Sequence, residues 1–340
     1  MSDPTRTFLP QSIVASGAAD IGCRRKHNED TVLLRPDLQL YILADGAGGH
    51  NAGNVASALA ATAIANFFES AGHGRAEEPD NDGLGLPIVG RRLAAALQKA
   101  NDDVLEIAKT SNKLKGMGTT AVAVAFLPQT GMAHVAHVGD SRCYRWRDGV
   151  LEQLTHDHSL INDALEMRPN MDDEQLAKLP ANVVTRALGM EPQIRVSVRP
   201  YRTLAGDKYL LCSDGLTDAL EDDVIADLLA VQRTPEETVR ALIARANDND
   251  ANDNVGVVVM NVSLSNDASA HVKPRPPSRM PPPKKATSDD SSPEIVILGY
   301  DAESDMPDMR APMITVVPTD SADDSIIEVL EDFTKKPKPG

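Results

Sequence analysis

The sequence predicts an α+β fold, because it contains both short apolar strands and longer helices with one apolar face. Segments rich in Val, Ile, Leu and Tyr are bounded by Gly, Pro, Asn or Asp, as is typical of strands. Other segments carry apolar residues at helical spacing. With 340 residues, of which 41% are hydrophobic, the chain can bury a full core in one large domain or in two smaller ones.

The expected elements alternate irregularly along the chain. Strands are expected at 12–19, 31–34, 41–43, 119–127, 132–138, 143–146, 193–198, 207–212 and 255–260. Helices are expected at 54–69, 89–110, 221–229 and 235–247, with Asn51 or Asn54 capping the first and Thr234 capping the last ahead of Pro235. A polar, weakly helical segment at 160–181 is expected to form a mobile flap beside the body.

Two of the expected strands deliver a carboxylate into a turn. The strand at 41–43 leads to A-D-G-A-G-G and Asp45, and the strand at 207–212 leads to S-D-G and Asp214. Asp253 is the carboxylate closest to the last expected strand and is a third acid at a strand end. One strand that ends in Asp-Gly usually indicates only a hairpin turn. Because a buried carboxylate without a partner is costly, the repetition indicates a cation, either a basic side chain or a metal ion.

The loop at 22–30, G-C-R-R-K-H-N-E-D, mixes basic and acidic residues between two expected strands. By itself this composition also fits a solvated turn. Arg25 offers a planar fork suited to phosphate, while Glu29 and Asp30 supply the hard oxygen atoms that Mg²⁺ and Mn²⁺ prefer. Asp140, in G-D-S-R, adds a carboxylate on a tight turn between two strands.

The cysteines, histidines and net charge argue against several other classes of protein. The three cysteines, Cys23, Cys143 and Cys212, are widely separated, which argues against a zinc site and suits a reducing compartment. His156 and His158 alternate on a loop, and a structural, hydrogen-bonding role is favoured for them. The net charge of -16 repels nucleic acid and anionic membranes. Without a signal peptide or an apolar span, a cytoplasmic protein is expected.

Seven short motifs occur in a fixed order along the chain. They are G-x-x-R-x-x-N-E-D at 22–30, A-D-G-A-G-G at 44–49, M-G-T-T at 117–120, G-D-S-R at 139–142, T-R-A-L-G at 185–189, C-S-D-G-L at 212–216 and D-N at 253–254. In this order they resemble the PPM family of metal-dependent protein serine/threonine phosphatases, also called protein phosphatase type 2C, and most of all its compact bacterial members. The resemblance covers roughly 12–262.

The resemblance implies a four-layer α-β-β-α sandwich of two antiparallel sheets flanked by helices, with a metal site at one end. The implied metal ligands are Glu29, Asp45, Gly46 through its carbonyl oxygen, Asp140, Asp214 and Asp253, and the implied catalytic residues are Arg25, Asp30 and Asp45. Asp45 would bridge two Mn²⁺ or Mg²⁺ ions, between which a water would attack phosphorus. Asp30 would orient this water, Arg25 would bind the phosphate, and Asp140 would help to hold a third, weaker ion.

Two positions depart from the pattern of the family. Many members carry His directly after the first Asp-Gly, where it is thought to protonate the leaving oxygen, whereas this chain has Ala47. The general acid is therefore unassigned: His50 either takes this role or, as we favour, caps the helix or faces solvent. Gly256 stands where the family usually has Thr, so hydrogen bonding near Asp253 is expected to differ.

The composition changes after Leu264. The stretch at 273–285 is basic and rich in Pro, and 289–332 is acidic with few aromatic residues, which predicts disorder. Three apolar clusters, at 295–298, 313–317 and 326–330, are either incidental or add a strand to a sheet of a partner or of this chain. The predicted division is a lead at 1–11, a phosphatase domain at 12–263 and a tail at 264–340.

These inferences favour an enzyme that hydrolyses phosphoserine and phosphothreonine in proteins, opposing a serine/threonine kinase in signalling. One alternative is a weakly active module that binds or senses phosphoproteins, and the intact acidic set argues against it. Another is a hydrolase of small phosphoesters, which a shallow two-metal site does not exclude. The sequence does not specify the substrate, the kinase, the cellular metal, the oligomeric state or the role of the tail.

Overall fold

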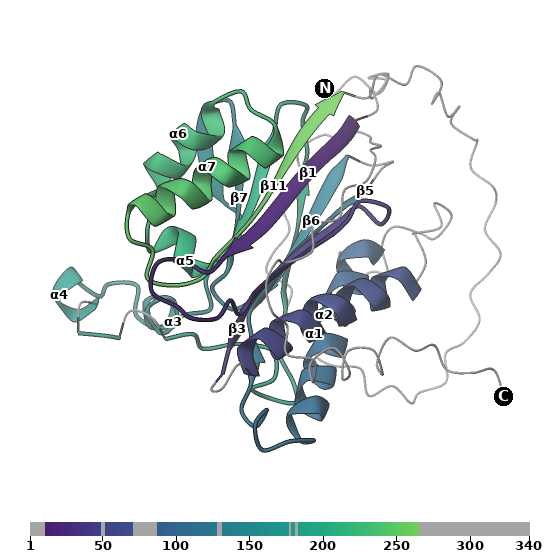
Figure 1. Cartoon of the computed structure of the whole chain (residues 1–340), viewed down its shortest axis with the longest axis vertical. Coiled ribbons are helices and arrows are strands. Elements are labelled where there is room, and N and C mark those ends of the chain that lie inside the picture. The colour runs from purple at the N-terminus through teal and green to yellow at the C-terminus, as the bar shows by residue number, and fades with distance from the viewer. Residues whose placement is uncertain are drawn as a thin grey trace.

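The computed structural model describes residues 11–48, 52–70, 87–127, 131–176, 178–180 and 183–264. Within this part of the chain, two antiparallel sheets pack face to face, and helices cover the outer face of each sheet (Figure 1). The predicted four-layer α+β sandwich is therefore confirmed. The predicted tail with its apolar clusters, most of the lead, and His50 lie outside the described residues.

The first sheet has the strand order β1-β11-β10-β7-β8. Its strands are β1 (Gln11–Asp20), β7 (Arg142–Arg147), β8 (Val150–Gln153), β10 (Lys208–Cys212) and β11 (Val255–Leu264). Strand β1 pairs with β11 along its whole length, from Gln11 opposite Leu264 to Asp20 opposite Val255. Figure 1 shows these two strands, from opposite ends of the described chain, side by side.

The second sheet has the strand order β2-β3-β5-β6-β9. Its strands are β2 (Asp30–Arg35), β3 (Leu40–Ala47), β5 (Ala121–Leu127), β6 (Met132–Val138) and β9 (Ser197–Arg202), and the short β4 (Gly118–Thr119) pairs with the end of β3. In this sheet Asp30 lies directly opposite Asp45. The pairing of β2 with β3 therefore brings two acidic residues to the same end.

Two pairs of helices form the outer layers. Helices α1 (Ala52–Ser70) and α2 (Ile88–Ala108) cover the second sheet, and α6 (Asp222–Ala230) and α7 (Pro235–Asp248) cover the first (Figure 1). Helix α7 begins with the predicted cap: Thr234 Oγ1 accepts a hydrogen bond from Glu237 N at 3.2 Å, and Pro235 follows. No helix in the described part of the chain is both long and apolar enough for a bilayer crossing.

Three apolar clusters fill the three interfaces between the four layers. One lies between α1, α2 and the second sheet, one between the sheets, and one between the first sheet and α6 with α7. Strand β3 contributes to two of them, because Ile42 faces the helices while Tyr41 and Leu43 face the other sheet. Both faces of β3 are thus buried, which explains its continuous run of apolar residues.

Most expected elements are present, but some boundaries were wrong. Strand β3 continues through Asp45 to Ala47 instead of turning before Asp45, because β4 pairs with Gly46 and Ala47. Strand β9 covers Ser197–Arg202 and not 193–198. Strand β8 was missed, and so was the short helix α5 (Asp214–Thr217), at whose start Asp214 lies. Asn54 lies inside α1 and cannot cap it, while Asn51 lies outside the described residues.

The predicted flap at 160–181 contains two short helices, α3 (Leu160–Met167) and α4 (Asp173–Leu176). No residue of α3 is buried, and α4 projects from the body (Figure 1). The chain leaves the flap through Val184, which forms an isolated antiparallel bridge with Ser159. The flap therefore starts and ends at one place, although its mobility stays a prediction.

Candidate metal centre

The acidic residues selected from the sequence converge at one end of the sandwich. Asp30 and Asp45 face each other across β2 and β3, and Asp214 follows β10. A Cβ atom added to Gly215 would collide with the carbonyl oxygen of Asn254 and lie 3.3 Å from Cβ of Asp253. The turn after β10 therefore packs directly on the residues that precede β11, and the two sheets each contribute carboxylates to one site.

Burial and mutual repulsion raise the pKa of these carboxyl groups. Burial is the largest cause for Asp30 and Asp214, and it helps to raise the pKa of each to about 7. Burial also raises the pKa of Asp45 well above its usual value, and the charges of Asp30 and Asp214 are the next causes. A cluster of this kind is stabilised by a bound cation, because a cation removes the repulsion between the carboxylates.

Glu29 and the carbonyl group of Gly46 meet beside the start of α1. A Cβ atom added to Gly53 would lie 2.8 Å from Oε1 of Glu29 and 2.7 Å from the carbonyl oxygen of Gly46. Both oxygen atoms therefore lie around one small space that any larger residue at position 53 would fill. Burial raises the pKa of Glu29, and the backbone of Gly53 offsets this in part with a hydrogen bond.

Asp30 lies behind these oxygen atoms and is almost fully buried. Ser213 Oγ donates a hydrogen bond to Asp30 Oδ2 at 2.7 Å, and Ser213 Oγ in turn accepts one from Gly256 N at 2.8 Å. The other oxygen, Oδ1, is buried and has no hydrogen-bond partner among the described residues. A buried carboxylate oxygen of this kind has the capacity to accept a hydrogen bond from a water in the site.

Asp253 and Arg25 form an ion pair with each other. The residue expected to bind phosphate thus contacts a carboxylate expected to bind metal. Among the described side chains, no three acidic, His or Cys groups close around one point as a complete ligand set. The donors nevertheless fit a hard divalent ion, since Mg²⁺ and Mn²⁺ accept few carboxylates, take carbonyl oxygen atoms and keep several waters.

The turn that carries Asp140 is tied to Asp45 through hydroxyl groups. Thr120 Oγ1 lies 2.7 Å from Ser141 Oγ and accepts a hydrogen bond from Asp45 N at 3.1 Å. The backbone N–H of Gly139 donates to Nδ1 of His158 at 3.1 Å, so His158 has the expected structural role. Asp140 is thereby held beside the other acids, and its charge contributes to the raised pKa of Asp214.

Two further residues of the site were not selected from the sequence. Asp218 lies one helical turn after Asp214, and its charge helps to raise the pKa of both Asp140 and Asp214. The spacing D-G-L-T-D was the available signal, but a strand end and not a helix was expected there. Asn254 Oδ1 accepts a hydrogen bond from Glu29 N at 2.9 Å. Asn254 Nδ2 donates to the carbonyl oxygen atoms of Ile21 and His27, in the loop that precedes Glu29.

Comparison with known proteins identifies the family. The family "Protein phosphatase 2C" matches residues 24–254, which include every acidic residue of the site. The chain belongs to the protein phosphatase 2C family. This protein phosphatase 2C chain is 35% identical over 252 residues to the serine/threonine phosphatase stp of Listeria monocytogenes, with 72% of this chain and 94% of that protein covered. It is 36% identical over 245 residues to the serine/threonine protein phosphatase PstP of Mycobacterium tuberculosis, with 72% of this chain and 44% of that protein covered.

Solved structures of the family have the same fold. The catalytic domain of the serine/threonine protein phosphatase PstP in complex with two manganese ions is 33% identical, with a TM-score of 0.61 and coverage of 74% of this chain and 99% of that one. The serine/threonine phosphatase of S. agalactiae is 32% identical, with a TM-score of 0.63 and coverage of 73% and 99%. The sequence-based assignment to this family is therefore confirmed.

Proposed function

We propose that this chain hydrolyses phosphoserine and phosphothreonine in proteins and that its acidic cluster holds the divalent ions for this reaction. The observation that carries the proposal is the convergence of Asp30, Asp45 and Asp214, whose pKa values all lie above the usual range. The relatives named serine/threonine phosphatases, one of them solved with two manganese ions, support both parts of the proposal.

The ligands come from both sheets. Asp45, Asp214 and Asp253 would hold the ions together with Glu29 and the carbonyl group of Gly46. When bound, two divalent ions activate water as the nucleophile and neutralise charge on the phosphate. Because the chain supplies only oxygen donors here, Mg²⁺ and Mn²⁺ both suit the site.

Two residues act on the reactants and not as ligands. Asp30, fixed through Oδ2 by Ser213, presents Oδ1 to orient the attacking water. Arg25 is half-exposed. Its guanidinium group leaves Asp253 and then binds the phosphate group of the substrate. Since a guanidinium group can bind two phosphate oxygen atoms at once, Arg25 also sets the orientation of the substrate.

Finer parts of the proposal extend the family assignment. Asp140, with Asp214, would hold a third and weaker ion. The substrates are phosphoproteins made by a serine/threonine kinase, which places the enzyme in signalling, and we propose a cytoplasmic location. The apolar clusters of the tail offer sites for a partner.

The substitution Asp45→Asn tests the metal site. It is expected to abolish tight binding of Mn²⁺ in calorimetric titration and to lower kcat by more than about 100-fold. Even the loss of a residue that only supports a metal ligand lowers metal affinity or activity by about 10–100-fold. The metal-free variant should remain folded, because the change removes a charge that Asp30 and Asp214 repel. Asp148→Asn is the matched control: it makes the same change in an exposed turn, at a positive φ of 50° that Asn tolerates.

Wild-type affinity for Mn²⁺ in an inactive Asp45→Asn variant would refute the ligand role of Asp45. The reaction itself is tested with phosphopeptides that carry phosphoserine, phosphothreonine or phosphotyrosine, beside small phosphoesters. Hydrolysis of the small esters without any phosphopeptide would favour the small-molecule alternative. Phosphopeptide binding without turnover in Mn²⁺ or Mg²⁺ would favour a sensing module.

A further inference from the structure

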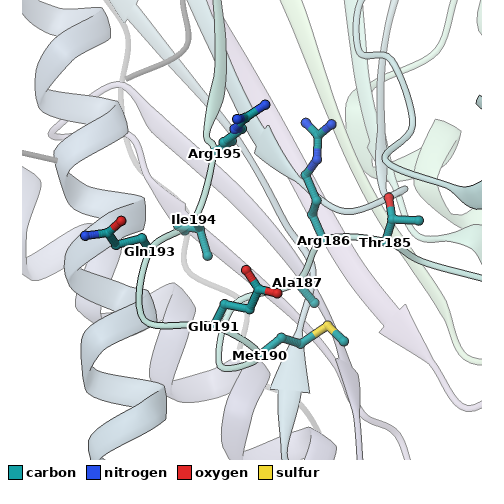
Figure 2. Close-up of a pocket in the computed structure, with 8 residues that line it drawn as sticks. All are labelled: Thr185, Arg186, Ala187, Met190, Glu191, Gln193, Ile194 and Arg195. Atoms are coloured by element: carbon teal, nitrogen blue, oxygen red, sulfur yellow. The ribbon is translucent and has the colours of Figure 1, made fainter. Parts of the chain in front are cut away.

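A cavity lies in the segment that precedes β9. It has a volume of about 290 Å³, and its lining comes entirely from one stretch, 185–195, between the flap and β9 (Figure 2). We call it the arginine pocket, because Arg186 and Arg195 both line it. Met190, Glu191 and Ile194 complete most of its wall. The pocket therefore combines two cations, one acid and an apolar surface.

Backbone pairing fixes the pocket next to the proposed metal site. Within the same stretch, Leu188 exchanges two hydrogen bonds with Thr119, at 3.0 and 2.8 Å. Thr119 in turn pairs with Gly46, and its side chain donates to the carbonyl oxygen of Asp45 at 2.8 Å. Two strand spacings thus separate the pocket stretch from the strand end with Asp45, which corresponds to about 10 Å.

The wall of the pocket is preformed. The completely buried Asn101 of α2 accepts a hydrogen bond from Gly189 N at 2.8 Å and donates one to the carbonyl oxygen of Glu191 at 2.8 Å. Gly189 has a φ of +88°, which a side chain would strain, so the turn is held in one shape. A ligand that enters the pocket therefore meets side chains on a fixed backbone.

The arginines of the pocket make few polar contacts with the rest of the described chain. Arg195 is exposed, and its side chain makes no hydrogen bond or ion pair with the residues that the structure describes. Among the described residues, Arg186 forms a long ion pair, 3.6 Å, with Asp163 of the flap. Figure 2 shows both guanidinium groups on the same side of the pocket, away from the carboxylate of Glu191. Met190, which is 60% exposed, adds an apolar surface that is also open to solvent.

We infer that the arginine pocket binds an anionic side chain of the phosphoprotein substrate, at a fixed spacing from the phosphorylated residue. Arg195, which has no partner among the described residues, and Arg186, which is loosely paired with Asp163, provide a local positive site for a carboxylate or a second phosphate in a chain of net charge -16. An extended peptide rises about 3.3 Å per residue, so a separation of about 10 Å corresponds to roughly three residues. This inference rests on the proposed function, because it concerns the substrate of the same site.

The test measures kcat/KM of the full chain, with Mn²⁺, on neutral phosphothreonine peptides in which one Glu is moved through the five positions on each side. We expect a maximum at two to four residues from phosphothreonine on one side, about 3–10-fold above the peptide without Glu, as suits a partly exposed charge-assisted hydrogen bond. The variant Arg195→Glu should lose this preference and favour Lys at the same position. Arg240→Glu, an equally reversed charge on exposed α7, should leave the preference unchanged.

The outcomes distinguish a failure of the pocket inference from a failure of the proposed function. If no phosphopeptide is hydrolysed, the proposed function fails. If the neutral peptide is hydrolysed and Glu has no effect at any position, or the effect survives in Arg195→Glu, the pocket inference fails while the function stands. A second phosphothreonine in place of Glu shows which anion binds better. If a peptide of residues 289–305 inhibits the wild type but not Arg195→Glu, without any substrate preference, the occupant is the acidic tail and the inference is overturned.

Discussion

At the scale of single residues, the site is a cluster of carboxylates that neighbouring side chains support through hydrogen bonds. Asp45 and Asp214 were predictable because each comes at the end of a run of apolar residues, where a charge needs compensation. The supporting residues Ser213 and Asn254 could not be predicted, because they act through hydrogen bonds between segments more than 180 positions apart. No local pattern reports such pairs.

Gly256 gives the departure from the family pattern a physical reason. A Cβ atom at this position would lie 2.8 Å from Asp30 Oδ2 and 3.1 Å from Leu43 Cδ1. The missing side chain therefore leaves the space in which Asp30 accepts its hydrogen bond from Ser213. The expectation that hydrogen bonding near Asp253 differs from that of the family stays a prediction.

We predict that Gly256→Ala destabilises the protein by about 1–2 kcal/mol, because the added methyl group overpacks a buried site. In an Asp30→Ala background the same change should cost much less, because the nearest atom is gone. Urea unfolding of the wild type, the two single variants and the double variant measures this coupling. An equal cost in both backgrounds would show that Leu43, and not Asp30, limits the space.

At the scale of secondary structure, burial decided which elements the sequence revealed. Strand β3 and helices α1 and α2 carry strong apolar patterns because each contributes to a core cluster. Strand β8 is mostly exposed, so its pattern V-L-E-Q gave little signal. The range predicted for β9 began too early, because Asn101 of α2 holds the preceding turn through hydrogen bonds to Glu191 and Pro192. A local sequence pattern does not show this contact.

That contact leads to a prediction for Asn101. We expect Asn101→Ala to cost about 1–3 kcal/mol of unfolding free energy, because it leaves the N–H of Gly189 and the carbonyl group of Glu191 without their partner. It should also weaken any preference for acidic peptides, since the pocket wall loosens. Denaturant unfolding and the peptide series measure the two effects.

Gln98→Ala is the control for this experiment. Gln98 is on the same helix and donates to the same turn, at the carbonyl oxygen of Pro192, but its bond is long at 3.3 Å and exposed. Its loss should cost less than about 0.5 kcal/mol. If both variants lose equal stability, burial of Asn101 is not what fixes the turn.

At the scale of the whole molecule, the fold closes by joining its first and last described strands. Strand β1 pairs with β11 over ten residues each, and the register ends with Gln11 opposite Leu264. The three core clusters draw on residues from Ile13 to Val262. The described sandwich thus spans 11–264, and the acidic sequence that follows it contributes to the net charge of -16.

We predict that removal of residues 266–340 changes the melting temperature by less than about 2 °C and leaves phosphopeptide turnover within a few-fold of the full chain. The reason is that β1 and β11 pair from Gln11 opposite Leu264 onward and the described clusters lie within 13–262, so the truncation leaves all of these residues in place. Thermal unfolding and kcat/KM on one neutral phosphopeptide measure both effects. A shift of more than about 5 °C corresponds to roughly 1–2 kcal/mol for a domain of this size and would mean that an apolar cluster of the tail packs on the body. Higher turnover after truncation, at an unchanged melting temperature, would instead mean that the acidic tail competes with substrate for the positive surface near Arg195.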